Sequence, residues 1–171
     1  RRLRLPDGSI RVLVGIADVD AIVPKGSPID HFAWLNTVSL YTGVHTFAML
    51  PLELSTDRTS LLEDGKDRLA VVTEIVVRTD GSLDDAQTKI YVAKVNNKAK
   101  LVYEQVGAWL EGRGTAPAGG QVIADQLKLQ DEAAQRLRKL RHLHGALDPG
   151  RIEATRVRKG AQVGDLTGQD T

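Results

Sequence analysis

The chain has 171 residues, no cysteine and a formal net charge of +1, with 23 Lys and Arg against 22 Asp and Glu. The missing cysteine excludes disulfide scaffolds, cysteine-ligated zinc or iron–sulfur sites and a thiol nucleophile. No apolar run approaches the ~20 residues that a membrane-spanning helix needs, and no signal-peptide apolar segment opens the sequence. Only 4% of the residues are aromatic, so the core is predicted to be aliphatic. This composition is typical of a globular domain, and we expect a cytoplasmic location.

The N-terminal part predicts one hairpin and one helix. Residues 1–5 alternate Arg and Leu, a Pro-Asp-Gly-Ser turn follows, and the apolar run 10–16 completes a hairpin whose second strand is expected to be buried. Ser27 begins a helix, because a capping serine, a proline at the first helical position and an acid in the first turn follow one another. Residues 39–52 are expected to be extended or irregular. The apolar residues of the helix expected to face the core are Ile29, Phe32, Ala33 and Leu35.

A second hairpin and two further helices are predicted along the rest of the chain. Residues 69–77 have the strongest strand pattern, and residues 88–95 return after a Thr-Asp-Gly-Ser turn. Residues 100–111 predict a helix that Gly112 ends. Apolar residues at helical spacing, Ala134 among them, predict a longer helix over 121–144. Two antiparallel hairpins and three helices place the chain in the α+β class.

Charge is distributed unevenly along the chain. Residues 50–90 contain nine acidic and five basic residues, a net charge of −4, whereas residues 136–160 contain eight basic and two acidic residues, a net charge of +6. The basic segment predicts either a face that binds a polyanion or a helix end whose cations complement the negative end of the helix dipole. Both interpretations stay open from the sequence.

The motifs of several common enzyme classes are missing. The sequence has no phosphate-binding loop, no dinucleotide fingerprint, no GxSxG and no HExxH. It contains four histidines, and His142 and His144 are two positions apart, so on a helix they would point in different directions. We therefore expect surface or capping roles for His31, His45, His142 and His144, and no histidine metal site.

Two pairs of carboxylates stand close together in the sequence. Asp18 and Asp20 end the apolar run, and on a strand they could share one face and line a site. The alternative is that they cap neighbouring backbone amides. Asp84 and Asp85 follow a turn and are expected to be solvated.

Tyr41 and Tyr103 are two of the three tyrosines, and either ring could bind a base. A base stacked on an exposed ring contributes about 1–3 kcal/mol to binding. Even two exposed rings would therefore contribute noticeably to the binding of a nucleic acid. The alternative places either ring in the core with its hydroxyl hydrogen-bonded.

Seven segments carry a family resemblance: Ile-Ala-Asp-Val at 16–19, Val-Pro-Lys-Gly-Ser-Pro-Ile-Asp at 23–30, Met-Leu-Pro-Leu-Glu-Leu-Ser at 49–55, Ser-Leu at 60–61, Asp-Arg-Leu-Ala at 67–70, Lys-Ala-Lys-Leu-Val-Tyr-Glu-Gln-Val at 98–106 and Gly-Ala-Leu-Asp at 145–148. In this order and spacing they resemble the catalytic RNB domain of the ribonuclease II and ribonuclease R exoribonucleases. The resemblance implies a partial RNB catalytic domain over residues 1–148. Residues 149–171 are expected to be an irregular or truncated segment of the same domain.

The resemblance implies processive 3′-to-5′ hydrolysis of single-stranded RNA to nucleoside 5′-monophosphates, with Mg²⁺ held by a cluster of aspartates. That cluster is expected upstream of Arg1 and an assisting arginine beyond Thr171, so no catalytic or metal-binding residue is assigned within the chain. The start at Arg1 instead of a methionine agrees with a fragment. The remainder of the catalytic domain and the flanking RNA-binding domains are expected to be missing, and the 171 residues alone are expected to be inactive.

Two residues carry over from the family. Tyr41 matches a tyrosine that stacks near the 3′ end of the RNA and sets the product length, although residues 42–45 depart from the usual family sequence. Tyr103 matches a tyrosine associated with choosing RNA over DNA. Asp18 also matches, without an assigned chemical role. The alternative is a non-catalytic RNA-binding member or fragment of the family, whose basic segment would bind phosphates with a steep salt dependence.

Overall fold

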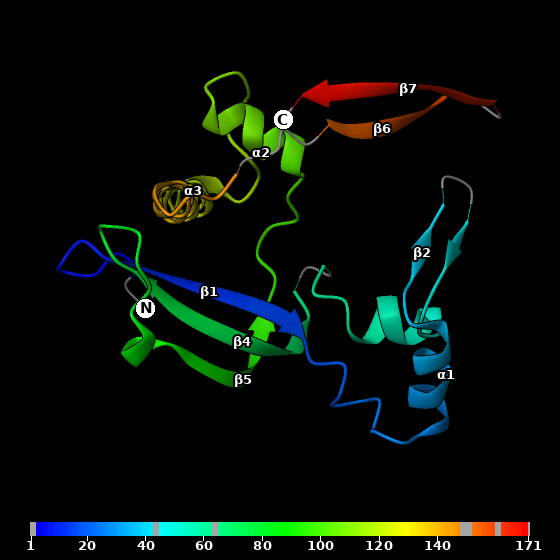
Figure 1. The fold of residues 1–171 in the computed structure, drawn as a ribbon. Helices are drawn as coiled ribbons and strands as arrows, with labels where there is room; N and C mark the ends of the chain where they lie inside the picture. The colour runs from blue at the N-terminus through cyan, green and yellow to red at the C-terminus, as the bar shows by residue number, and fades with distance from the viewer. Residues whose placement is uncertain (1–2, 43–44, 63–64, 148–151, 160–161, 171) are drawn as a thin grey trace.

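The computed structural model describes residues 3–42, 45–62 and 65–147, together with the backbone of two strands at 152–159 and 162–170. Figure 1 shows a three-stranded sheet with a long helix over it, a smaller unit of one helix and two short strands beside it, and a C-terminal hairpin. Helices combined with antiparallel strands confirm the predicted α+β class. Within the described residues, no helix is long and apolar enough to cross a membrane.

The main sheet contains β1 (Ile10–Ala17), β4 (Asp67–Val77) and β5 (Lys89–Asn96), and β4 lies in the centre. Both pairings are antiparallel. The predicted hairpin of β4 and β5 is confirmed, and its connection contains a short 3-10 helix, η2 (Asp85–Gln87). The β-branched residues of β4 favour the extended backbone, and alternate positions from Ala70 to Val76 are buried.

The predicted first hairpin is confirmed in part. Arg4 forms an antiparallel bridge to Ile10, and the backbone N–H groups of Leu5 and Arg11 donate to the carbonyl oxygens of Ser9, at 2.9 Å, and of Leu3, at 2.7 Å. The main pairing of β1 is nevertheless with β4, along all eight of its residues. β1 is also not buried as expected, because only Ile10 is buried and Ile16 is 67% exposed.

The turn before β1 forms as predicted. The Asp7 carboxylate accepts hydrogen bonds of 3.0 Å from the backbone N–H and from the hydroxyl of Ser9. These two donors lower the pKa of Asp7 below its usual value. The side chain of Asp80 bonds Ser82 in the same way in the turn that follows β4, at 2.9 and 2.7 Å. Two similar Asp-Gly-Ser turns therefore adjoin the same end of the sheet, where Ile10 pairs with Val77.

The helix α3 (Gly120–Leu143) covers that end of the sheet (Figure 1). Ala133 packs with Ile10 and Val77 in a buried cluster, and Leu137 lies against it. Ala134, which the helical spacing placed inward, is exposed. The small alanine at position 133 allows the helix and the sheet to approach closely.

Arg136 connects α3 to both turns. Its guanidinium donates to the carbonyl oxygens of Gly8, at 3.0 Å, and Arg78, at 3.5 Å. It also forms an ion pair of 2.6 Å with Glu132. A second ion pair joins Glu132 to Arg4, and the hydrogen bond from Arg4 is the main cause that lowers the pKa of this carboxyl.

A smaller unit surrounds α1 (Pro28–Asn36), β2 (Leu40–Tyr41), β3 (Thr46–Phe47) and the π-helical turn η1 (Glu53–Arg58). The Ser27 hydroxyl accepts a hydrogen bond of 3.2 Å from the backbone N–H of Asp30, which confirms the predicted cap. Of the predicted core stripe, only Ala33 packs against the buried cluster of this unit. Ile29, Phe32 and Leu35 are exposed, so the stripe is wrong as a core prediction for these positions. The buried members of the cluster are Val23, Leu50 and Leu54.

The helix α2 (Tyr103–Leu110) confirms the helix predicted after residue 100. The expectation of an irregular segment over 149–171 is wrong where the backbone is described, because β6 (Ile152–Lys159) and β7 (Gln162–Asp170) form an antiparallel hairpin. Pairing of adjacent strands needs only backbone hydrogen bonds, and this segment lacks the apolar alternation that would have indicated it.

Candidate nucleic-acid interface

Tyr41 projects from the short hairpin of β2 and β3. Tyr41 pairs with Thr46, and Thr42 closes the loop by donating from its backbone N–H to the carbonyl of His45 at 3.0 Å. Gly43 and Val44 lie outside the described residues. The side chain of Tyr41 is 76% exposed. The hairpin therefore presents the ring to solvent, and the core alternative does not apply to Tyr41.

Tyr103 occupies the first position of α2 and is 95% exposed. The backbone before it is extended at Val102, and the Asn97 side chain accepts a hydrogen bond of 3.1 Å from the N–H of Ala99. These contacts order the approach to the helix without covering the ring. The core alternative fails for Tyr103 as well.

The third tyrosine behaves differently. The Tyr91 hydroxyl donates to a carboxylate oxygen of Glu74 at 3.0 Å, and the other oxygen of Glu74 lies 3.0 Å from Nε of Arg11. Glu74 is only 3% exposed, so its carboxylate is buried against these partners. Tyr91 is therefore a structural residue. No sequence signal marked Glu74, because it stands within the strongest apolar strand.

The two exposed tyrosines do not form one pocket. Figure 1 shows β2, beside α1, well separated from α2, which lies on the far side of α3 from the sheet. Any single ligand that contacts both rings must therefore be extended. A nucleic-acid strand has that shape, whereas a small molecule does not.

Asp18 and Asp20 do not share a strand face. β1 ends at Ala17, and the backbone N–H of Asp18 donates to the carbonyl of Leu69 at 3.0 Å. Asp20 lies beyond this point in irregular chain. The period-two argument for a shared face therefore fails, because it holds only within a strand.

Asp84 is not simply solvated, contrary to the expectation. Its side chain is 17% exposed and lies 3.2 Å from the Arg78 guanidinium. The Gln87 side chain donates to it at 2.9 Å, and this bond, with Arg78, lowers the pKa of Asp84. Asp85 is exposed as expected. Asp84 thus holds the loop between β4 and β5 through its contacts with Arg78 and Gln87.

Three of the four histidines take local packing or capping positions. His31 stacks on Trp34 with 5.9 Å between ring centroids, and His45 meets Phe47 edge to face at 4.7 Å. His144 follows α3 and donates from its backbone N–H to Leu140. Among the described residues, no three His, Asp or Glu side chains gather closely enough to hold a metal ion.

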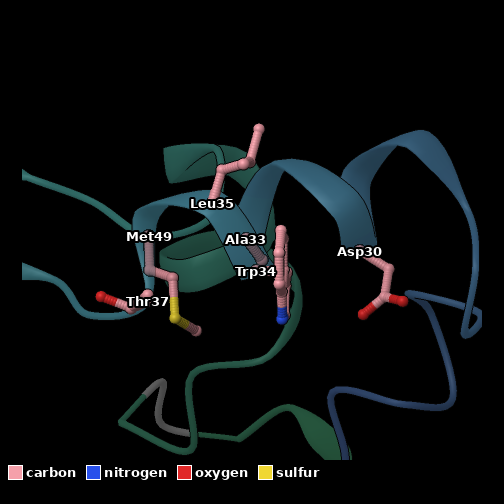
Figure 2. A pocket seen from close by; sticks show the side chains of 6 residues that line it. All are labelled: Asp30, Ala33, Trp34, Leu35, Thr37 and Met49. Atoms are coloured by element: carbon pink, nitrogen blue, oxygen red, sulfur yellow. The ribbon is translucent and has the colours of Figure 1, made fainter.

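An open pocket of about 680 Å³ lies beside α1 (Figure 2). Trp34, Met49 and Asp30 point to the same side of the helix, whereas Leu35 points away. The Asp30 carboxylate already accepts a bond of 2.7 Å from the N–H of Gly26, so the pocket has an apolar wall and no paired acid and base. No motif in the sequence marks Trp34, whose side chain is exposed. Helical spacing places Trp34 off the stripe of Ile29 and Ala33, and this is the one sequence signal for its exposure.

Comparison with known proteins identifies the relatives of this arrangement. The family model for the RNB domain matches residues 2–170. Exoribonuclease 2 of Escherichia coli strain UTI89 is 34% identical over 149 residues, which is 87% of this chain and 23% of that protein.

Solved structures agree with the family model. Mycoplasma genitalium RNase R in complex with ribose-methylated single-stranded RNA superposes with a TM-score of 0.87 at 27% identity, over 98% of this chain and 26% of that one. The same enzyme with double-stranded RNA gives a TM-score of 0.86 at 27% identity, over 96% of this chain and 29% of that one. The chain therefore spans about a quarter of the length of these relatives. From its sequence match and its fold together, the chain belongs to the RNB domain family.

Proposed function

We propose that this chain is a segment of a Mg²⁺-dependent, processive 3′-to-5′ exoribonuclease that hydrolyses single-stranded RNA to nucleoside 5′-monophosphates. The curated relative is an exoribonuclease, and the similar RNase R structures hold RNA. The observation that carries the proposal is a contrast among the three tyrosines. Tyr41 and Tyr103, which the family resemblance selects, expose their rings, whereas Tyr91 bonds a buried carboxylate.

The proposed roles of the chain's own residues are binding and positioning. Tyr41 stacks on a base close to the 3′ end, a contact that contributes about 1–3 kcal/mol and fixes where the final product ends. Tyr103 contacts the RNA elsewhere along the strand and favours RNA over DNA. Because the rings lie on separate elements, they guide an extended single strand.

The family implies a divalent metal cofactor, and we propose Mg²⁺, which would activate water and stabilise the leaving oxygen. The described residues do not fit such a site, since they supply no cluster of metal-binding side chains. We therefore keep the metal ligands as a prediction for residues upstream of Arg1 and assign no step of hydrolysis to this chain. The 171-residue chain alone is proposed to be inactive, and the whole enzyme to be cytoplasmic.

The test uses the full-length protein and a 5′-labelled single-stranded RNA, with Mg²⁺ or with EDTA. Tyr41→Ala should lengthen or shift the limit product while degradation continues. Trp34→Ala is the matched control, because it removes another exposed ring that the proposal does not place on the RNA. An identical product ladder for Tyr41→Ala and wild type would remove Tyr41 from the RNA path. RNA binding without any hydrolysis would instead favour a non-catalytic RNA-binding member of the family.

A further inference from the structure

The backbone of Thr37 is strained at the end of α1. Its φ is +59°, and no other non-glycine residue in the described part of the chain has a positive φ. A β-branched side chain disfavours this region of backbone conformation. Thr37 is also the centre of a tight turn, in which the N–H of Val38 donates to the carbonyl of Asn36 at 2.6 Å. Strain of this kind concentrates at ligand sites, and Thr37 lines the open pocket beside α1 (Figure 2).

One face of α1 forms this pocket. Its residues from the helix and from the cap that follows stand at positions i, i+3, i+4 and i+7, which share a helix face. The volume of about 680 Å³ lies within the range of about 300–1,000 Å³ that ligand sites have. We call this site the α1 pocket, and the side chains that form it come from Asp30, Ala33, Trp34, Thr37 and Met49.

The indole of Trp34 lies in the middle of the α1 pocket. Figure 2 shows the ring edge-on, between Met49 and Asp30. The Trp34 side chain is 71% exposed. His31 stacks on one face of the ring, with 5.9 Å between the ring centroids, so the other face is left for a ligand. The α1 pocket thus offers a flat apolar wall to a ligand that lies along the helix.

Hydrogen-bond acceptors lie at both ends of this wall. At one end, Oδ2 of Asp30 accepts from the N–H of Gly26 at 2.7 Å, which leaves Oδ1 for a ligand. At the other end, the hydroxyl of Thr37 has no hydrogen bond within the described part of the chain. Thr37 follows Asp30 by seven residues, so the two acceptors stand roughly 10 Å apart along the helix axis.

The charge of the surrounding unit favours a cationic ligand. Residues 18–58, which contain this unit, include five acidic and two basic residues, a net charge of −3 with histidine neutral. One of the two bases, Arg58, lies 3.9 Å from the carboxylate of Glu53. No Lys or Arg is among the described residues that line the α1 pocket. A phosphate group is therefore repelled here, whereas a cation is attracted.

We propose that the α1 pocket binds an arginine side chain of a partner protein, an interaction beyond the proposed function and independent of it. The guanidinium donates to Oδ1 of Asp30, the methylene groups pack on the indole of Trp34, and the backbone N–H of the arginine donates to the hydroxyl of Thr37. An extended arginine with a hydrogen bond at each end spans a distance of this order. Leu35 and Val38 are 63% and 65% exposed, so an arginine flanked by apolar residues covers more of this surface than free arginine.

The test follows the indole N–H signal of Trp34 by NMR in the full-length protein labelled with nitrogen-15 tryptophan. The signal is identified by its loss in Trp34→Phe. Three peptides are titrated: Gly-Leu-Arg-Leu-Gly, the same peptide with lysine, and the same peptide with citrulline, which keeps the planar shape of arginine without its charge. The arginine peptide should shift the signal saturably and bind about fivefold more tightly than the citrulline peptide. The lysine peptide should bind with an intermediate affinity, because it keeps the charge without the plane.

Asp30→Asn removes the charge and keeps an acceptor for the N–H of Gly26. In this variant the arginine and citrulline peptides should bind with equal affinity, because the difference between them depends on the carboxylate. The matched control is Asp20→Asn, which removes an exposed carboxylate that does not line the α1 pocket. The control should keep the fivefold preference for arginine.

Thr37→Gly separates binding from stability. Glycine adopts a positive φ without strain, so the melting temperature should stay close to that of the wild type. Loss of the hydroxyl should weaken binding of the arginine peptide about threefold. Unchanged binding in Thr37→Gly would overturn the proposed arrangement.

The comparison of peptides is made on the wild type, so its result does not depend on the folding of a variant. The inference is overturned if the arginine peptide causes no saturable shift of the Trp34 signal at millimolar concentration. Equal binding of the arginine and citrulline peptides overturns it as well. A single-stranded RNA that shifts the same signal and displaces the arginine peptide would assign the α1 pocket to RNA and also overturn the inference.

Discussion

Gly81→Ala tests how closely α3 packs against the turn that follows β4. Gly81 has a φ of +88°, in the left-handed region that a side chain disfavours by about 1–2 kcal/mol. A Cβ at this position would also lie 2.3 Å from the carbonyl oxygen of Arg136 and 3.2 Å from Cβ of Leu140. The variant therefore combines backbone strain with a collision against the helix.

The collision determines the size of the effect. Non-bonded contacts are optimal at about 3.5–4.0 Å, so α3 must retreat by about 1 Å. Overpacking of this kind destabilises by about 1–3 kcal/mol, and the retreat stretches the bond from Arg136 to Gly8. With the backbone strain included, we expect a loss of about 3 kcal/mol.

Gly145→Ala is the matched control at the end of the same helix. Gly145 has a φ of +84°, and nothing lies within 4 Å of its added Cβ, so only the backbone strain of about 1–2 kcal/mol applies. Hydrogen–deuterium exchange of the full-length protein measures both variants locally. Exchange in α3 and β4 should be about tenfold faster in Gly81→Ala than in the control, the equivalent of about 1.5 kcal/mol. Equal exchange in the two variants would refute the close packing of α3 on this turn.

Three further predictions concern the core, an ion pair and the choice of substrate. Ile10→Ala removes a fully buried side chain and should lower the free energy of unfolding by about 2–5 kcal/mol. The control Ile90→Ala removes an exposed side chain and should change it by less than about 0.5 kcal/mol. Urea unfolding measures both variants, and similar losses would contradict the assigned core. The hydrogen bond from Arg4 lowers the pKa of Glu132 from its ordinary 4.5, so the stability it contributes is present above that value and is lost as the pH falls through the folded-state pKa. Glu132→Gln should therefore flatten the free energy of unfolding against pH in this acidic range, and an unchanged profile would argue against the ion pair. Tyr103→Ala in the full-length protein should narrow the ratio of degradation rates on matched single-stranded RNA and DNA, and an unaltered ratio would remove Tyr103 from substrate choice.

The sequence predicts the elements of this fold whose signals are local. The structure confirms the cap at Ser27 and the hairpin of β4 and β5, because capping and hairpin formation depend on neighbouring residues. The pairing of β1 with β4 joins segments that stand far apart in the sequence, so no local pattern indicates it. The helix α1 shows a third case. Its apolar spacing predicts a helix, which the structure confirms, but spacing does not show whether a side chain is covered, and the ring of Phe32 is exposed.

The residues of the candidate site also differ in whether the sequence predicts them. The family resemblance selected Tyr41 and Tyr103, but only the structure shows that both rings are exposed and that they lie on separate elements. Glu74 could not be recognised from the sequence, because one carboxylate within an apolar strand carries no sign of its partners Arg11 and Tyr91. Such contacts depend on three strands meeting in one sheet, which is a property of the tertiary fold.

The end from which the RNA is degraded distinguishes a 3′-to-5′ exoribonuclease from other ribonucleases. The full-length protein would be incubated with Mg²⁺ and a single-stranded RNA labelled at its 5′ end in one sample and at its 3′ end in another. We expect the 5′-labelled strand to shorten progressively, while the 3′ label is released at once as a nucleoside 5′-monophosphate. Shortening from the 5′ end, internal cleavage, or an intact strand in the presence of Mg²⁺ would contradict this expectation.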